Sequence, residues 1–164
     1  MLAGCARLAG GTPAVPVLAR DRSLLLASPT VPKVLIATDA DWIHDEVEAA
    51  LADESTSVVR VRSGREVGAA MREHKPDLVV MDSQIGNMGG IATFLHLKQE
   101  IESGRMDDAG MLLLLDRPAD VPLARQVGID GWLIKPLDAF RLRKAATALL
   151  AGGDFHEPSG LASV

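Results

Sequence analysis

The chain has 164 residues, a net formal charge of −5 at neutral pH and a hydrophobic content of 48%. This length suits one domain with a real core, and the absence of a Lys- and Arg-rich block argues against direct nucleic-acid binding. No apolar segment is long enough to predict a membrane span. The single cysteine, Cys5, excludes an internal disulfide, and one cysteine with four scattered histidines argues against a zinc site. We therefore expect a cytoplasmic protein.

The two ends of the chain differ in composition from its middle. Residues 1–31 are rich in Ala, Gly, Pro and Leu without a sustained period, which predicts either a disordered extension or a start codon assigned too far upstream. Residues 152–164 contain Gly, Pro and Ser and predict a short C-terminal tail. Residues 32–151 are the expected folded domain.

Within this domain, apolar runs alternate with segments of helical period. Apolar runs predict strands at 33–38, 57–61, 78–82, 111–115 and 131–134. Helical periodicity predicts helices at 41–52, 64–74, 90–103, 118–127 and 137–151. Strands that alternate with helices indicate an α/β fold with a parallel sheet and right-handed crossovers.

Charged residues stand at the carboxyl ends of three predicted strands. Asp39 follows the first strand, Asp82 closes the central apolar run, and Lys135 follows the last strand. In open α/β sheets, ligands and chemistry collect at this edge. An aspartate there can attack phosphorus, Mg²⁺ on oxygen ligands can spread the charge, and an ammonium can neutralise a phosphoryl oxygen. Asp41, two residues after Asp39, is expected to cap a helix.

These segments resemble the receiver domain of two-component response regulators, of the chemotaxis-regulator type. Residues 76–90, with Asn87, Met88 and Gly90 in register, resemble the segment that carries the phosphoacceptor aspartate. Residues 128–136 resemble the segment with the family's lysine and proline, and the whole resemblance covers roughly residues 32–150. It implies a doubly wound, flavodoxin-like sheet of five parallel strands in the order 2-1-3-4-5, flanked by five helices.

The resemblance also implies roles for individual residues and partners. Asp82 would accept the phosphoryl group, with Lys135 and Asp116 beside it, and Mg²⁺ would be held by Asp39, Asp82 and the backbone carbonyl of Gln84. A histidine kinase or another signalling protein would be the partner. The face of the fourth helix, fifth strand and fifth helix would bind partners or a second copy. Such a protein is not an enzyme and needs neither nucleic acid nor membrane.

Several positions depart from the family pattern. The first strand usually ends in two acids but here ends in Thr38-Asp39, which weakens the expected Mg²⁺ site or removes it. The Ser or Thr that usually ends the fourth strand is Asp116, whose carboxylate repels a phosphoryl group, and Arg117 follows in place of a small residue. Trp132 replaces a Tyr or Phe that moves when the family switches, and is either a packing or a docking residue.

Two interpretations of these departures remain open. In one, Thr38 and Asp116 have exchanged hydroxyl and acid roles around Asp82, and a Mg²⁺ site of altered shape survives. In the other, the pocket is degenerate, and Arg117 pairs with a nearby acid in a pseudo-receiver that acts as a constitutive interaction module. The leading hypothesis is an atypical stand-alone receiver that accepts phosphate on Asp82. A flavodoxin-like nucleotide binder is disfavoured, because no Gly-rich phosphate loop follows the first strand.

Overall fold

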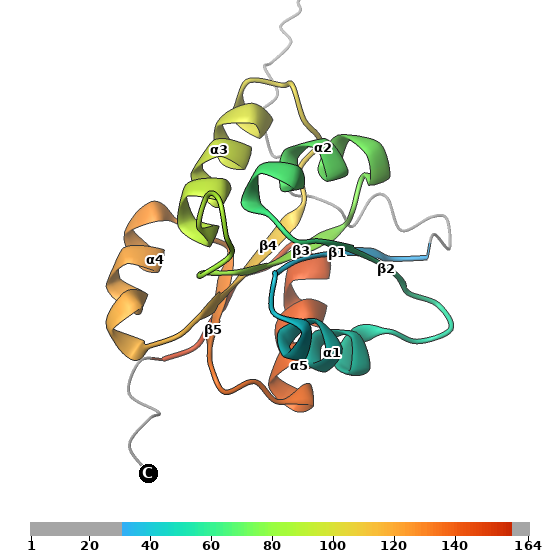
Figure 1. The fold of residues 1–164 in the computed structure, drawn as a ribbon, viewed down its shortest axis with the longest axis vertical. Coiled ribbons are helices and arrows are strands. Elements are labelled where there is room, and N and C mark those ends of the chain that lie inside the picture. The colour runs from blue at the N-terminus through green and yellow to red at the C-terminus, as the bar shows by residue number, and fades with distance from the viewer. Residues whose placement is uncertain (1–30, 159–164) are drawn as a thin grey trace, which may run out of the picture.

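The computed structural model describes residues 31–158, so the predicted extension before Val31 lies outside the described residues. Six parallel strands form one sheet in the order β2-β1-β3-β4-β5-β6. Helices α1 and α5 cover one face of this sheet, and α2, α3 and α4 cover the other (Figure 1). The fold is therefore the doubly wound α/β architecture that the sequence predicted, with one further strand.

The elements follow one another along the chain with short connections. The strands are β1 (Lys33–Ala37), β2 (Ser57–Val61), β3 (Leu78–Asp82), β4 (Gly110–Leu115), β5 (Gly131–Ile134) and β6 (Phe155–His156). The helices are α1 (Asp41–Leu51), α2 (Gly64–His74), α3 (Gly90–Glu102), α4 (Val121–Val127) and α5 (Ala139–Leu150), with a 3-10 turn, η2 (Pro118–Asp120), before α4. Among the described residues, the helices are too short or too polar to cross a bilayer.

The central strands are buried on both faces because helices pack against each side. All five residues of β3 are buried, as are the last five of β4, which explains why both strands read as unbroken apolar runs. β2 lies at one edge of the sheet, where none of its residues is fully buried. The pattern of burial thus separates the centre of the sheet, where functional groups are held rigidly, from its edges.

One expected helix cap is absent. The residue before α1 is Ala40, whose side chain makes no capping bond, and Asp41 is the first residue inside the helix. The Asp41 carboxylate instead contacts the guanidinium groups of Arg60 (2.8 Å) and Arg62 (2.9 Å) on and after β2. The hydrogen bond from Arg60, with the positive charges of both arginines, lowers the pKa of Asp41 below its usual range. The capping prediction was wrong: the helix begins at Asp41 itself, and Arg60 on β2 and Arg62 just after it bind this carboxylate.

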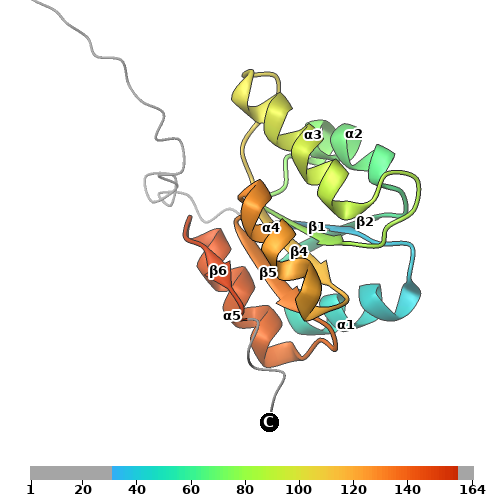
Figure 2. The same ribbon diagram turned by 90° about the vertical axis from the view of Figure 1, so that its left-hand side faces the viewer.

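The sixth strand was not predicted. Phe155 and His156 pair in parallel with Gly131 and Trp132 of β5, inside the segment expected to be a tail (Figure 2). A strand of two residues shows no alternation of polar and apolar side chains, so periodicity cannot reveal it. β5 is consequently an internal strand of the sheet rather than its edge.

Close backbone packing at Gly90 holds the start of α3 against the end of β3. A Cβ atom at Gly90 would lie 2.6 Å from the carbonyl oxygen of Asp82 and 2.9 Å from the Cα of Ser83. Both are backbone atoms that cannot move aside, so we expect Gly90→Ala to lower the free energy of unfolding by about 1–3 kcal/mol in urea denaturation.

A matched glycine serves as the control for this experiment. A Cβ at Gly68, inside α2, would meet its nearest side-chain atoms at 3.9 and 4.0 Å, which is ordinary contact. We expect Gly68→Ala to stabilise the protein by about 0.5–1 kcal/mol, the usual gain in a helix interior. Equal effects of the two substitutions would contradict the assignment of tight packing to Gly90.

Candidate functional site

Four polar side chains meet where the central strands end. The register pairs Ala37 with Met81 and Leu115 with Ile134, so the residues just beyond each strand share one rim of the sheet. These residues are Thr38 after β1, Asp82 at the end of β3, Asp116 after β4 and Lys135 after β5. The sequence predicted this convergence for Asp82 and Lys135, and the structure brings them into direct contact.

Asp82 is the centre of the cluster. Its side chain is almost fully buried, and its Oδ1 accepts hydrogen bonds from Lys135 Nζ (2.8 Å) and from the backbone N–H of Gln84 (3.1 Å). Its other oxygen, Oδ2, accepts one hydrogen bond, from the Thr38 hydroxyl (3.2 Å). The carboxylate is therefore fixed in orientation, with Oδ2 as the less engaged oxygen.

Lys135 bridges two carboxylates. Its Nζ donates to Asp82 Oδ1 and also to Asp116 Oδ1, at 2.6 Å. Burial alone would lower the pKa of Lys135, but the hydrogen bonds and negative charges of Asp116 and Asp82 outweigh it, and the pKa is raised. The ammonium is thus held in its charged form by two acids rather than one.

Thr38 and Asp116 flank Asp82 from the two neighbouring strands. The Thr38 hydroxyl donates to Asp82 and accepts from the backbone N–H of Ala40 (3.1 Å). Arg117 does pair with a nearby acid, but that acid is Asp120 in η2 (3.3 Å), and the Arg117 side chain is 73% exposed. The hydroxyl and the carboxylate therefore both belong to the cluster, whereas the Arg117 guanidinium does not contact its carboxylates.

The predicted metal ligands lie around one loop. Asp39 is exposed, and its Oδ2 is 3.2 Å from the position that a Cβ on Gly86 would take, so the carboxylate borders the β3–α3 loop. Gln84 belongs to the same loop and is joined to Asp82 through its N–H. Two carboxylates and a backbone carbonyl are the oxygen donors that a hard divalent cation prefers, so these residues fit Mg²⁺.

Two residues of the site were missed by sequence reasoning. Trp42, in the first turn of α1, is half exposed, and Lys135 Nζ lies 5.8 Å from the centre of its ring. Arg60 donates from Nε to the carbonyl oxygen of Thr38 (3.2 Å) and thereby ties β2 to the rim. The signals were present in the sequence, as an aromatic residue directly after Asp41 and a cation among the valines of a predicted strand.

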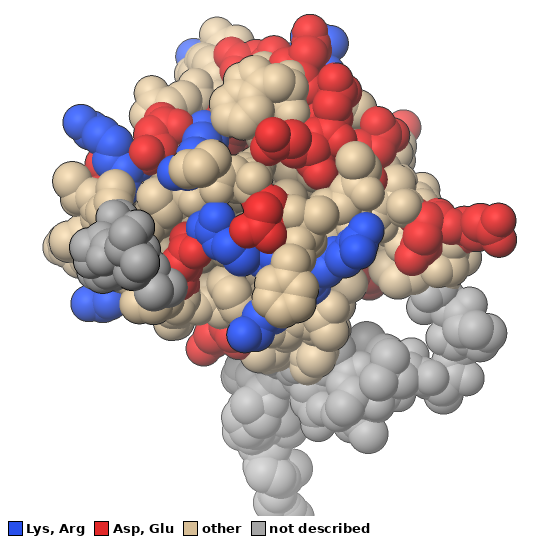
Figure 3. Space-filling model, turned by 90° about the horizontal axis from the view of Figure 1, so that it is seen from below, with Lys and Arg blue, Asp and Glu red and all other residues tan. Residues whose placement is uncertain are grey.

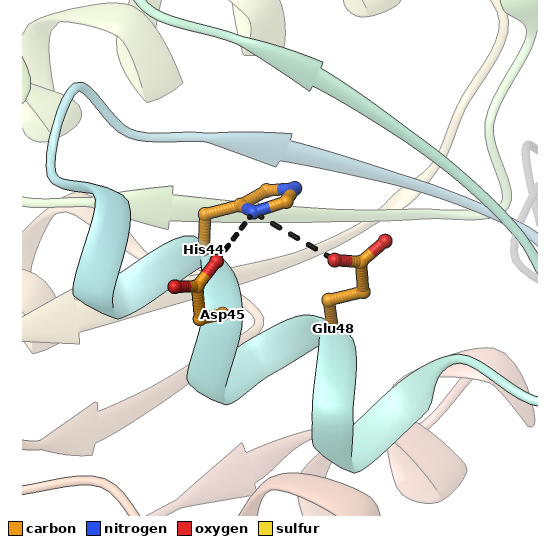
Figure 4. Close-up of side chains that lie close together, drawn as sticks. All are labelled: His44, Asp45 and Glu48. Atoms are coloured by element: carbon orange, nitrogen blue, oxygen red, sulfur yellow. Dashed lines mark hydrogen bonds and ion pairs between the residues drawn. The ribbon is translucent and has the colours of Figure 1, made fainter.

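A second group of possible metal ligands lies on α1 alone. His44 Nδ1 is 3.3 Å from Asp45 Oδ1 and 3.8 Å from Glu48 Oε2 (Figure 4). Asp45 and Glu48 are exposed, and groups of exposed acids are common without a bound ion. We therefore assign no site to these residues.

Surface charge is mixed at the end of the molecule seen from below in Figure 1. In that view Lys and Arg side chains lie between Asp and Glu side chains and uncharged surface (Figure 3). No continuous basic stripe crosses the face shown there. The view fits the acidic balance of the sequence.

The fold and the rim define a doubly wound α/β protein with a cluster of acidic side chains around Lys135 at the carboxyl ends of its strands. The family model of the response regulator receiver domain matches residues 34–147. The chain therefore belongs to the receiver domains of two-component response regulators, as the resemblance predicted.

Curated relatives include short and long proteins. The chain is 28% identical to the chemotaxis protein CheY of Bacillus subtilis over 119 residues, which are 72% of this chain and 97% of that protein. It is 26% identical over 120 residues to PilH of Pseudomonas aeruginosa, which cover 73% of this chain and 98% of PilH. It is also 26% identical to the transcriptional regulatory protein AfsQ1 of Streptomyces coelicolor, but it spans only 53% of that protein's length and the match covers 76% of this chain.

Solved structures agree on the fold. The chemotaxis response regulator CheY4 of Vibrio cholerae superposes with a TM-score of 0.63 at 24% identity, covering 73% of this chain and 99% of CheY4. A LuxR-family two-component response regulator from Aurantimonas sp. superposes with a TM-score of 0.66 at 25% identity, covering 77% and 89% of the two chains. The sheet order and helix arrangement are thus those of receiver domains.

Proposed function

We propose that this protein is an atypical receiver that accepts a phosphoryl group on Asp82 with the help of Mg²⁺ and signals by protein–protein contact. The observation that carries the proposal is the 2.8 Å contact between Lys135 Nζ and a buried Asp82 at the end of the central strand. In this pair, the Asp82 carboxylate is a nucleophile of fixed orientation. The Lys135 ammonium can neutralise the negative charge on the oxygens of the transferred phosphoryl group.

The chain's own residues would divide the work of transfer. The Oδ2 atom of Asp82, held by a single hydrogen bond, would form the new bond to phosphorus. The bond from phosphorus to the donor would break, and the leaving atom, an imidazole nitrogen of a phosphorylated histidine in a kinase, would take the electron pair. Lys135 would then contact a phosphoryl oxygen. A cation held by Asp39, Asp82 and the Gln84 carbonyl would spread the negative charge.

The Thr38 hydroxyl, after β1, can act as the hydrogen-bond donor that the family usually supplies from a Ser or Thr at the end of β4. It already donates to Asp82 Oδ2 (3.2 Å) and accepts the backbone N–H of Ala40 (3.1 Å). Its proton is therefore directed at the oxygen that would carry phosphorus. This arrangement supports only the hydroxyl part of the exchange between Thr38 and Asp116, because the Asp116 carboxylate is engaged by Lys135.

A second candidate function follows from the Asp116 carboxylate. Because Asp116 already lies 2.6 Å from Lys135 Nζ, the ammonium is neutralised by two acids without any phosphoryl group. Such a pocket would be fixed in one state, as in a pseudo-receiver that binds its partner regardless of phosphorylation. The two candidate functions differ in whether Asp82 can accept a phosphoryl group.

Direct phosphorylation distinguishes them. We expect the protein to gain the mass of one phosphoryl group when incubated with a small-molecule phosphodonor and Mg²⁺, and the isosteric Asp82→Asn variant to gain none. Intact-protein mass spectrometry measures the gain. Beryllofluoride with Mg²⁺ is a second probe, read from the fluorescence of Trp42 above Lys135 in a Trp132→Phe background. No mass gain and no fluorescence response would overturn the phosphoacceptor proposal in favour of the pseudo-receiver.

A further inference from the structure

The segment after α5 folds back onto the sheet and forms one wall of a pocket. The backbone N–H of Phe155 donates to the carbonyl oxygen of Asp130 (3.1 Å), and β6 then runs parallel to β5 beside α5 (Figure 2). We call residues 154–158 the return segment. A pocket of about 570 Å³ lies between this segment, the end of β5 and the first half of α5. Pockets of this size enclose small molecules in other proteins.

The wall formed by the return segment is held firmly in place. Glu157 is buried, its Oε2 accepts the backbone N–H of Ile134 (2.6 Å), and its Oε1 forms an ion pair with Arg141. Its backbone carbonyl accepts the indole N–H of Trp132 (2.9 Å). The His156 ring stacks on the same indole with centroids 4.2 Å apart, and Trp132 is 1% exposed, so this tryptophan is a packing residue. The pocket is therefore formed before any ligand binds, which lowers the entropic cost of binding.

Most of the charged groups around the pocket are already paired. Glu157, the one acid among the lining residues, is bound to Arg141, whose guanidinium also donates to two backbone carbonyls. The Lys135 ammonium is bound to two carboxylates at the rim of the sheet. Lys144 also lines the pocket and is exposed, and no acid among residues 31–158 pairs with it. The lining residues thus offer one free ammonium and no free carboxylate, which suits an anionic ligand.

Aromatic rings form much of the apolar part of the pocket. The sequence has three phenylalanines. Phe94 is buried in the core, whereas Phe140 and Phe155 both line the pocket. The Phe140 side chain is 74% exposed, and Phe155 is half-buried. Two rings near one ammonium can hold a ligand that has a flat apolar body and a negatively charged end.

We propose that this pocket binds a small aromatic carboxylate, with its ring against Phe140 and Phe155 and its carboxylate on the Lys144 ammonium. Burial of the rings would supply most of the affinity, and the charge-assisted hydrogen bond would favour an anionic ligand over an uncharged one. The return segment supplies Phe155 and, through Glu157, neutralises Arg141. The inference does not depend on whether Asp82 accepts phosphate.

Two probes of similar shape and different charge test the proposal on the full-length protein. 2-Naphthoate carries a carboxylate, and 2-naphthalenemethanol carries an uncharged hydroxyl group in a similar place. We expect naphthoate to bind at one site in isothermal titration calorimetry, at least about fivefold more tightly than the alcohol, because its carboxylate is also attracted by the charge of the ammonium. Amide shifts in two-dimensional NMR spectra should be confined to the end of β5, the first half of α5 and the return segment.

Two variants separate the contributions of charge and ring. In Lys144→Met we expect naphthoate to bind only as tightly as the alcohol, whose own affinity should change by less than about twofold. Phe140→Ala should weaken both probes, since both lose the same apolar contact. Both positions are exposed, so the variants should fold, which circular dichroism checks. Lys33→Met, at the exposed amino end of β1, is the matched control and should leave both affinities unchanged.

The outcomes that would overturn the proposal are distinct. Equal affinities of the two probes for the wild-type protein, or an unchanged naphthoate affinity in Lys144→Met, would overturn the selectivity for an anion. Absence of saturable binding, or amide shifts centred on another part of the chain, would overturn the site itself.

Discussion

Lys135→Met is expected to lower the free energy of unfolding by about 3–5 kcal/mol, the usual cost of removing one partner from a buried ion pair. The Lys135 and Asp82 side chains are only 12% and 3% exposed, so water cannot replace the lost ammonium. Removal of the ammonium would also leave the Asp82 and Asp116 carboxylates without their shared counter-charge. Urea denaturation at neutral pH measures the loss.

A double variant and a surface lysine control this experiment. Lys135→Met combined with Asp116→Asn removes one of the two stranded charges and should recover part of the lost stability. Lys144→Met, on the exposed side of α5, should change stability by no more than about 0.5 kcal/mol. If Lys135→Met lowered the free energy of unfolding by less than about 1 kcal/mol, the Lys135–Asp82 pair would be as weak as an exposed surface ion pair. That result would contradict the expected loss.

The ion pair between Lys135 and Asp82 determines how the stability that Lys135 contributes changes with pH. Because the folded-state pKa of Lys135 is raised, its contribution to stability is complete below the unfolded-chain value of about 10.4 and is lost as pH rises through the folded-state pKa. The stability difference between the wild-type protein and Lys135→Met should therefore be constant around neutral pH and shrink only in strongly alkaline solution.

Asp116→Thr is expected to speed phosphorylation of Asp82 by a small-molecule donor roughly tenfold or more, since each tenfold in rate corresponds to about 1.4 kcal/mol of barrier. Threonine removes a carboxylate from the Lys135 ammonium and supplies a hydroxyl that can donate to the phosphoryl group. The initial rate of mass gain at saturating Mg²⁺ measures the effect.

A failure of this variant would be equally informative. If Asp116 has taken over a metal-binding role from the position of Thr38, Asp116→Thr should weaken Mg²⁺ binding and slow the reaction. Adding Thr38→Asp would then restore both, because the pair of changes returns the hydroxyl and the acid to the places usual in the family. A slow single variant rescued by the double variant would contradict simple repulsion by Asp116 and support the exchange of roles.

The sequence predicted most of the fold because its signals are local and repeated. β3 and β4 are long apolar runs buried on both faces, and the boundaries of α2 and β5 agree with the structure to the residue. α4 begins three residues later than expected, after the 3-10 turn η2. The meeting of Asp82 and Lys135 was predicted because both stand at the carboxyl ends of strands of one parallel sheet, on either side of β4.

The remaining features depend on contacts between distant residues. Asp41 was expected to cap α1, and the arginines that bind it come from another part of the chain, 19 and 21 positions later. Glu157 lies in a segment whose Gly, Pro and Ser content indicated a tail, and nothing in that composition reveals a buried carboxylate facing Arg141. Lys135 was expected beside Asp82, but only the three-dimensional arrangement shows that Asp116 shares it.

The exchange of Thr38 and Asp116 moves a negative charge across the pocket without changing the total. Asp39, Asp82, Asp116 and Lys135 are three carboxylates and one ammonium, with a formal sum of minus two. The family arrangement, with two acids after the first strand, an aspartate, a lysine and a hydroxyl, has the same sum. One divalent cation would bring either pocket to electrical neutrality, whereas a monovalent ion would leave it negative. The proposed Mg²⁺ would therefore meet the same formal charge in either arrangement.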